Sequence, residues 1–173
     1  MKNYSIDDIR RLAGLAKWKP YLNNPILTIG EDGAWDGWTL ATMNILKVND
    51  IYHMYYEAGC RKVDDFQMGH ATSLDGINWV KDIINPIIPF GEPGSFDESA
   101  TWDPFVIYED GIFKMWYGGT AMSADGWDYQ MGYCESLDGS NFTNRCQISH
   151  FTYAKIHGNH EGRGNVADMH VAK

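Results

Sequence analysis

The feature that most constrains the fold is a repeat, because one stretch of the sequence returns in the same order 61 residues further on. The similarity begins with an Asn-Pro-Ile-hydrophobic string and continues through a Gly-Glu-x-Gly-x-aromatic-Asp string and an apolar, aromatic strand signal. The matched segments are 24–36 with 85–97, 52–56 with 113–117 and, after a two-residue insertion, 68–79 with 131–142. So many matches in one order indicate a fold built from copies of one structural unit.

Each copy contains about four strand signals. In the second copy they lie at 104–108, 112–117, 129–135 and about 142–148. Asp-Gly dipeptides separate them and favour the positive φ angles of tight hairpins, with Asp75 and Asp138 expected to tie the turns. Four antiparallel strands in a repeat of this length are typical of a β-propeller blade. Helical and leucine-rich repeats are shorter and lack such hairpins, and an immunoglobulin-like sandwich gives no reason for the repeat.

We therefore predict an all-β fold of propeller blades, preceded by one short helix. Ser5 and Asp8 form a helix-capping pattern, and apolar residues recur at helical spacing as far as Lys17. The chain is interpreted as a single domain over residues 1–173: helix and lead-in at 1–23, first repeat at 24–84, second at 85–147 and the start of a third at 148–173. This is about two and a half blades, whereas propellers close rings of about four to eight. Either the chain is a truncated piece, which we favour, or its open blade edges close by self-association.

Charge and composition exclude several kinds of partner. The 14 Lys and Arg residues against 23 Asp and Glu residues give a net charge of −9, so nucleic acid would be repelled. No apolar run approaches the roughly 20 residues that cross a bilayer, and the N-terminus has no signal-peptide core, so we expect a cytoplasmic protein without a membrane partner. The cysteines lack C-x-x-C spacing, and His157 and His160 lie in a Gly-rich stretch without a clear carboxylate partner. Neither a metal nor another cofactor is expected.

Taken together, the repeat motifs resemble those of a known superfamily. They are Asn-Pro-Ile-Ile at 85–88, Gly-Ser-Phe-Asp at 94–97, Trp-Asp-Pro-Phe-Val-Ile at 102–107, Lys-Met-Trp-Tyr-Gly-Gly at 114–119 and Ser-Leu-Asp-Gly at 136–139. They are similar to motifs of the five-bladed β-propeller glycoside hydrolases, which include families 43, 32 and 68. The resemblance runs from about Asn24 to the C-terminus. It implies a funnel on the propeller axis, where a carboxylate begins the innermost strand of three successive blades.

The same resemblance implies roles for two aspartates. In these hydrolases an Asp typically acts as base or nucleophile, a second Asp orients or stabilises, and a Glu is the acid. Asp103 of the Trp-Asp-Pro motif and Asp168, its counterpart in the third repeat, are accordingly the expected catalytic carboxylates. The first repeat departs from this pattern, with Thr42 at the position equivalent to Asp103. Either the acid Glu belongs to a blade that this chain lacks, or the first repeat is the first catalytic blade and has lost its base.

Six further residues are candidates for binding substrate: Trp35, Asp36, Glu57, Asp97, Trp102 and His170. The two aspartates follow aromatic residues just upstream of inner strands, where they either line the funnel mouth or cap a turn. Trp102 adjoins Asp103 and suits stacking on a sugar face. Glu57 stands where the second repeat has Gly118, so the blade itself does not require it. His170, on the third inner strand, is a candidate contact for a sugar hydroxyl.

The sequence as a whole favours a glycoside hydrolase-like protein, an enzyme in its complete form, that acts on O-glycosidic bonds of an oligo- or polysaccharide. Such hydrolysis needs two carboxyl groups across the scissile bond, about 5–5.5 Å apart for retention and about 6.5–9.5 Å for inversion. One of them must stay protonated near neutral pH. The alternative is a non-catalytic propeller that binds carbohydrate or serves in assembly, and Thr42 in place of Asp supports it.

Overall fold

Two groups of four strands make up the computed structural model, which describes residues 20–60, 63–123 and 126–148. The first group is β1 (Thr39–Val48), β2 (Ile51–Cys60), β3 (Val63–Ser73) and β4 (Val80–Lys81). The second group is β5 (Ala100–Glu109), β6 (Ile112–Ser123), β7 (Gly126–Ser136) and β8 (Thr143–Gln147). Within the described ranges, no helix is long and apolar enough to span a membrane. The helix expected at 5–17 and residues 149–173 of the third repeat lie outside these ranges.

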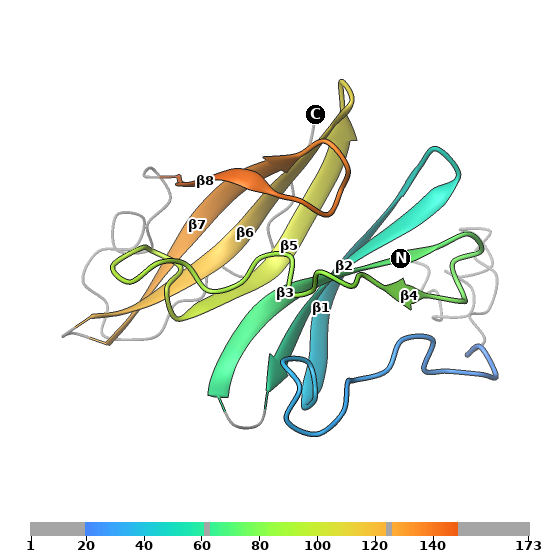
Figure 1. Ribbon diagram of the computed structural model, residues 1–173, viewed down its shortest axis with the longest axis horizontal. Helices are drawn as coiled ribbons and strands as arrows, with labels where there is room; N and C mark the ends of the chain where they lie inside the picture. Colours follow the sequence, from blue (N-terminus) through green and yellow to red (C-terminus); the bar gives the residue numbers. More distant parts are fainter. Residues whose placement is uncertain (1–19, 61–62, 124–125, 149–173) are drawn as a thin grey trace, which may run out of the picture.

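Each group forms one antiparallel sheet whose strands follow sequence order, β1-β2-β3-β4 and β5-β6-β7-β8. Figure 1 shows the sheets fanning apart from the middle of the molecule, where β5 lies beside the first sheet, with β4 and β8 on the outside. The first strand of each sheet is thus its inner strand and the last its outer strand. This meander confirms the predicted blade, and all four strand signals of the second repeat fall on strands of the second sheet.

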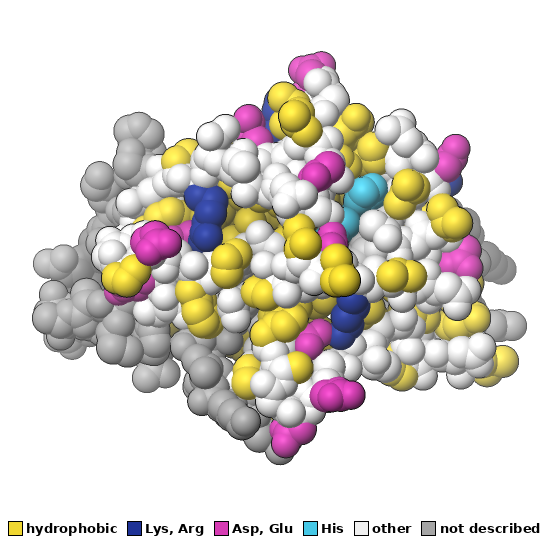
Figure 2. Space-filling model, in the orientation of Figure 1, with side chains coloured by type: hydrophobic (Ala, Val, Ile, Leu, Met, Phe, Trp, Pro, Cys, Tyr) yellow, Lys and Arg dark blue, Asp and Glu magenta, His cyan; other side chains and the backbone are white. Residues whose placement is uncertain are grey.

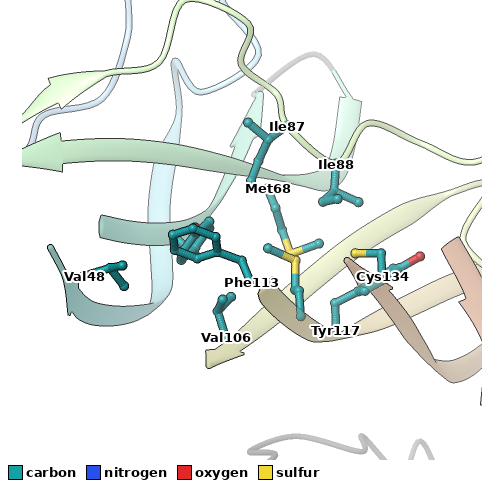
Figure 3. Close-up of a cluster of buried hydrophobic side chains, with 10 residues drawn as sticks. Val48, Met68, Ile87, Ile88, Val106, Phe113, Tyr117 and Cys134 are labelled. Carbon is teal, nitrogen blue, oxygen red and sulfur yellow. The ribbon is translucent and has the colours of Figure 1, made fainter. Parts of the chain in front are cut away.

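The main hydrophobic core lies between the two sheets (Figure 3). Its buried side chains are Val48, Tyr55, Met68, Ile87 and Ile88 from the first sheet and the linker, and Val106, Phe113, Met115, Tyr117 and Cys134 from the second sheet. Hydrogen bonds cross the same interface, and two of them lie beside this core. The Tyr55 hydroxyl donates to the Gly139 carbonyl at 2.8 Å, and the Val106 N–H donates to Asn44 Oδ1 at 3.0 Å. Burial of apolar surface stabilises a fold by about 25 cal/mol per Å². A core to which both sheets contribute therefore holds them together as one unit.

An aspartate ties each outer hairpin, as predicted. Asp138 Oδ1 accepts hydrogen bonds from the backbone N–H groups two and three residues ahead, at 2.9 and 2.8 Å. Asp75 makes the same pair of bonds at 2.8 and 2.7 Å. These bonds favour the carboxylate form and hold the pKa of both aspartates well below its ordinary value. The next residues, Gly76 and Gly139, have φ angles of 75° and 83°, which other residues rarely adopt.

Each inner strand carries a β-bulge, which lies one residue later in the repeat in β5 than in β1. The pairing with the second strand changes register within residues 40–43 of β1 and within residues 102–105 of β5. β5 begins at Ala100, earlier than the predicted start at Pro104, because a bulge accommodates a proline that a regular ladder position would not. Asp103 stands in this bulge with a φ angle of 48°, in the left-handed region that non-glycine residues seldom adopt.

Candidate active site

A buried glutamate connects the bulges of the two inner strands. Glu57 lies on β2 and is 7% exposed. Its Oε2 accepts the Thr42 hydroxyl from the bulge of β1 at 2.7 Å and the Asp103 backbone N–H from the bulge of β5 at 3.3 Å. The structure therefore brings two of the sequence candidates, Glu57 and Asp103, into direct contact. Thr42, which occupies the position equivalent to Asp103, joins them as a hydrogen-bond donor.

The surroundings of Glu57 favour its protonated form. Burial is the largest influence and raises the pKa of the carboxyl group above its ordinary value. The hydrogen bonds from Thr42 and from the Asp103 backbone act in the opposite direction, and the charge of the Asp103 side chain raises the pKa further. Two carboxyl residues on neighbouring blades, one of them pushed toward protonation, are the starting arrangement for acid/base chemistry.

Trp102 is held rigidly beside Asp103. Its ring packs on Gly118 of β6, where an added Cβ atom would lie 2.6 Å from the ring, so a side chain at Gly118 would displace it. The indole Nε1 donates to the Thr120 hydroxyl at 2.9 Å, and the Tyr129 ring packs edge-on with a centroid separation of 5.7 Å. Trp102 is half-buried in this position. A fixed, partly open aromatic ring next to a carboxyl residue suits stacking against a sugar ring.

Asp36 and Asp97 form ion pairs with the outer strands. Asp97 is 2% exposed, pairs with Arg145 of β8 and accepts the Tyr117 hydroxyl at 2.8 Å. Asp36 is 4% exposed and pairs with Lys81 of β4 at 2.5 Å. Each aspartate thus ties the segment ahead of an inner strand to the outer strand of the same sheet. These partners account for the burial of both carboxylates without a substrate.

The remaining candidates do not join the Glu57–Asp103 pair within the described residues. Trp35 stacks on Tyr56 in the small core of the first sheet, with ring centroids 6.0 Å apart. Asp168 and His170, like the histidines at 157–160, lie outside the described residues, so their roles stay predictions. In the part of the chain that the structure describes, no three His, Cys, Asp or Glu side chains are grouped to hold a metal ion.

Sequence reasoning missed a polar network between the two sheets. His53 Nδ1 lies 3.0 Å from His70 Nε2, and His70 Nδ1 lies 3.2 Å from Asp82 Oδ2 and 3.1 Å from Ser140 Oγ. Burial, and next the proximity of His70, lowers the pKa of His53 to about 4, and burial lowers the pKa of His70 as well. The repeat gave no signal for this network because the second copy has other residues at both histidine positions.

Comparison with known proteins tests the fold. The sequence matches no protein-family model and no curated protein. Zg3597, a family 117 glycoside hydrolase from the marine bacterium Zobellia galactanivorans, matches with a TM-score of 0.58 and 22% identity over 67% of this chain and 34% of that one. A glycosyl hydrolase from Bacteroides ovatus matches with a TM-score of 0.61 and 17% identity over 72% of this chain and 39% of that one. The chain has the fold of these glycoside hydrolases.

The described sheets are therefore two blades of a glycoside hydrolase propeller fold, as the sequence resemblance implied. A third structure, a complex of BT0996 with RGII, matches with a TM-score of 0.55 and 21% identity over 73% of this chain and 39% of that one. The chain spans about a third to two fifths of the length of these structures.

Proposed function

We propose that this protein hydrolyses O-glycosidic bonds of an oligo- or polysaccharide, with Asp103 and Glu57 as carboxyl groups of its active site. The contact that carries the proposal is the 3.3 Å hydrogen bond from the Asp103 N–H to Glu57 Oε2, which joins two carboxyl residues from adjacent blades at the bulges of the inner strands. The shared fold with glycoside hydrolases supports a glycosidase-like activity.

The two residues suit different parts of the reaction. Glycoside hydrolysis requires an acid that protonates the departing oxygen and a second carboxyl group that activates water or attacks the sugar carbon. The glycosidic C–O bond breaks as the acid gives its proton to the departing oxygen, a new C–O bond forms to water, and that water gives a proton to the second carboxylate. Glu57, whose pKa is raised by burial, is suited to hold the proton. Asp103 takes the second role, with the rigid Trp102 ring beside it to support the sugar.

Activity is a property of the complete site. Because the chain spans about a third to two fifths of the matched hydrolases, further residues of the substrate funnel are expected from other blades. Asp168 and His170, in the third repeat, are the proposed additional carboxylate and sugar contact. The BT0996 complex with RGII supports a carbohydrate as the substrate class.

Substitution of Asp103 tests the proposal. We expect Asp103→Asn to lower kcat/KM on a panel of chromogenic glycosides and oligosaccharides by about 10²- to 10⁴-fold, because a carboxamide neither accepts nor gives up a proton. Asp110→Asn is the matched control, since Asp110 follows the far end of β5 in the exposed β5–β6 turn and also has a positive φ angle of 54°. Undiminished turnover in Asp103→Asn, with Asp110→Asn also unaffected, contradicts the catalytic role.

A second function is favoured by one observation. Thr42 stands at the position equivalent to Asp103, and its hydroxyl is directed at Glu57. A site with a threonine hydroxyl in one blade and a carboxylate in the next can hydrogen-bond sugar hydroxyls without cleaving the glycosidic bond. Calorimetry with the same oligosaccharides separates the two functions. Binding without turnover by the protein with a complete ring of blades supports the non-catalytic alternative, whereas neither binding nor turnover by that protein contradicts both.

A further inference from the structure

The two blades place a carboxyl group differently at the same pair of positions. In the first blade the inner strand has Thr42 and the second strand has Glu57. In the second blade the equivalent residues are Asp103 and Gly118. A carboxyl side chain at position 42 would meet Glu57, because the Thr42 hydroxyl already lies 2.7 Å from Oε2. The first blade therefore has a hydrogen-bond donor at its bulge in place of a second carboxylate.

Both hydrogen bonds that reach Glu57 from the bulges end on the same oxygen. Oε2 accepts the Thr42 hydroxyl at 2.7 Å and the Asp103 backbone N–H at 3.3 Å. A backbone N–H can only donate, and in a protonated carboxyl group the carbonyl oxygen accepts a hydrogen bond better than the O–H oxygen does. The bonds at Oε2 therefore favour a proton on Oε1.

Thr42 reaches this buried carboxyl group from an exposed position. Thr42 is exposed, whereas Glu57 is 7% exposed. Because threonine is branched at Cβ, its side chain has few χ1 rotamers, and the hydroxyl is held toward its acceptor at little cost in entropy. A substitution at such an exposed position usually changes stability little. The hydroxyl can thus be removed without disturbing the core.

We propose that Thr42 is a positioning residue for Glu57: its hydroxyl and the Asp103 N–H hold Oε2 as the acceptor, and Oε1 carries the proton that passes to the departing sugar oxygen. This role rests on the function proposed above, in which Glu57 is the acid. As the proton leaves Oε1, the glutamate becomes a carboxylate that already accepts two hydrogen bonds at Oε2. These bonds stabilise the carboxylate and so assist release of the proton.

The charge of the whole chain acts on Glu57 in addition to these local bonds. The chain has a net charge of −9, and Figure 2 shows acidic side chains dispersed over one face of the molecule rather than gathered in one place. Salt screens such a diffuse field, with a Debye length of about 10 Å at 0.1 M, whereas a hydrogen bond is a contact that salt does not screen. The effect of Thr42 on Glu57 should therefore be the same at low and high ionic strength.

Titration of the Glu57 carboxyl carbon by NMR tests the role in the chain itself, without a substrate. We expect Thr42→Val to raise the midpoint by about 0.5 to 1 pH unit, because valine has the shape of threonine but offers no donor. Thr42→Ser keeps the hydroxyl and should keep the midpoint of the parent chain. Thr39→Val is the matched control on the same strand, since the Thr39 hydroxyl contacts the Leu40 carbonyl. An unchanged midpoint in Thr42→Val, or an equal rise in Thr39→Val, overturns the role.

Hydrogen exchange at the Asp103 amide tests which oxygen carries the proton. With the proton on Oε1, the Asp103 N–H keeps its acceptor when Glu57 is protonated. Its exchange should then be slowed relative to an unfolded chain by the same factor below and above the Glu57 midpoint. A loss of this protection as Glu57 is protonated would place the proton on Oε2 and overturn the assignment.

Turnover by the protein with a complete ring of blades separates this inference from the proposed function. Thr42→Val should lower kcat by about 3- to 10-fold with KM little changed, and the high-pH limb of the kcat profile should move upward, because a weaker acid stays protonated to higher pH. A raised NMR midpoint without turnover by the parent protein supports the positioning of Glu57 and contradicts the proposed hydrolysis. Turnover whose rate and pH profile are unchanged in Thr42→Val overturns the positioning role alone.

Discussion

The two blades follow one plan and differ most where their inner strands begin. The first blade has Ala41 and Glu57, and the second has Trp102 and Gly118 at the equivalent positions. The larger residue of each pair lies on the second strand in the first blade and on the inner strand in the second blade. The space beside the bulge is therefore filled by the Glu57 carboxyl group in one blade and by the Trp102 indole ring in the other. The two repeats therefore share the shape of the blade but carry different side chains where the inner strand begins.

The linkers ahead of the inner strands differ in degree rather than in kind. Asp97 and Asp36 stand at equivalent positions, and each forms an ion pair with the outer strand of its sheet. Asp97 has a planar Arg145 partner and also accepts the Tyr117 hydroxyl. Asp36 has the flexible Lys81 as its partner. The second blade has the more extensive network.

Removal of these two aspartates should produce the largest difference between the blades. We expect Asp97→Ala to lower the free energy of unfolding by about 3 to 4 kcal/mol, because it leaves a half-buried guanidinium and a buried hydroxyl without their acceptor. Asp36→Ala should cost about 1 to 2 kcal/mol, because Lys81 loses its acceptor but no buried hydroxyl such as that of Tyr117 is left unpaired with it. Urea unfolding measures both values. Equal losses would show that the two linkers are held equally well.

The histidine network gives the first blade a pH dependence that the second cannot have. An unfolded histidine binds its proton with a pKa of 6.5, whereas in the folded chain the pKa of His53 is lowered to about 4. Protonation therefore favours unfolding: the stability present above pH 6.5 is lost as the pH falls toward 4. We expect a loss of about 2 kcal/mol between pH 8 and pH 5 from this group.

Two equivalent substitutions locate this pH dependence. His53→Asn keeps a polar atom near the Nδ1 position but does not titrate, so the unfolding free energy should vary less between pH 8 and pH 5. Lys114→Asn changes the equivalent residue of the second blade and should leave the variation as it is in the parent chain. Denaturant unfolding at several pH values measures both. The same pH dependence in His53→Asn and the parent would assign the effect to other groups.

The local features of the blades could be predicted from the sequence because they depend on neighbouring residues. Asp-Gly dipeptides and apolar, aromatic strand signals located the hairpins and strands, and the repeat placed Asp103 at the start of an inner strand. The bulge itself was not predicted, since Pro104 suggested the start of a strand where the structure has an irregularity within one.

Contacts between residues far apart in the sequence were beyond local reasoning. Whether Asp36 and Asp97 capped turns or lined a funnel depended on which side chains of the outer strands would reach them, and these lie 45 and 48 residues away. The hydrogen bond from Asp103 to Glu57 likewise depends on how one sheet packs on the other. The candidate residues at the site could be named from the repeat, but their partners could not.

Glu57→Gln should have the smallest effect on the free energy of unfolding. It should raise stability slightly at pH 7 and lower glycoside turnover. Because burial raises the pKa of Glu57 in the folded chain, its ionisation opposes folding once the pH exceeds the ordinary value of 4.5. The amide oxygen can still accept from Thr42 and from the Asp103 N–H. We therefore expect the variant to be more stable at pH 7 by about 1 kcal/mol, a common size for a stabilising change at a functional site. This gain should disappear below about pH 4.5, where glutamate is protonated in both states.

The equivalent position of the second blade supplies the control for Glu57→Gln. Gly118→Ala should destabilise the chain at every pH, because its methyl group meets the Trp102 ring. Thermal unfolding at pH 4 and pH 7, with glycoside turnover measured on the same samples, checks both effects. If Glu57→Gln is less stable than the parent chain at pH 7, the charge of Glu57 favours folding and helps to hold the blades together. That result would contradict the prediction.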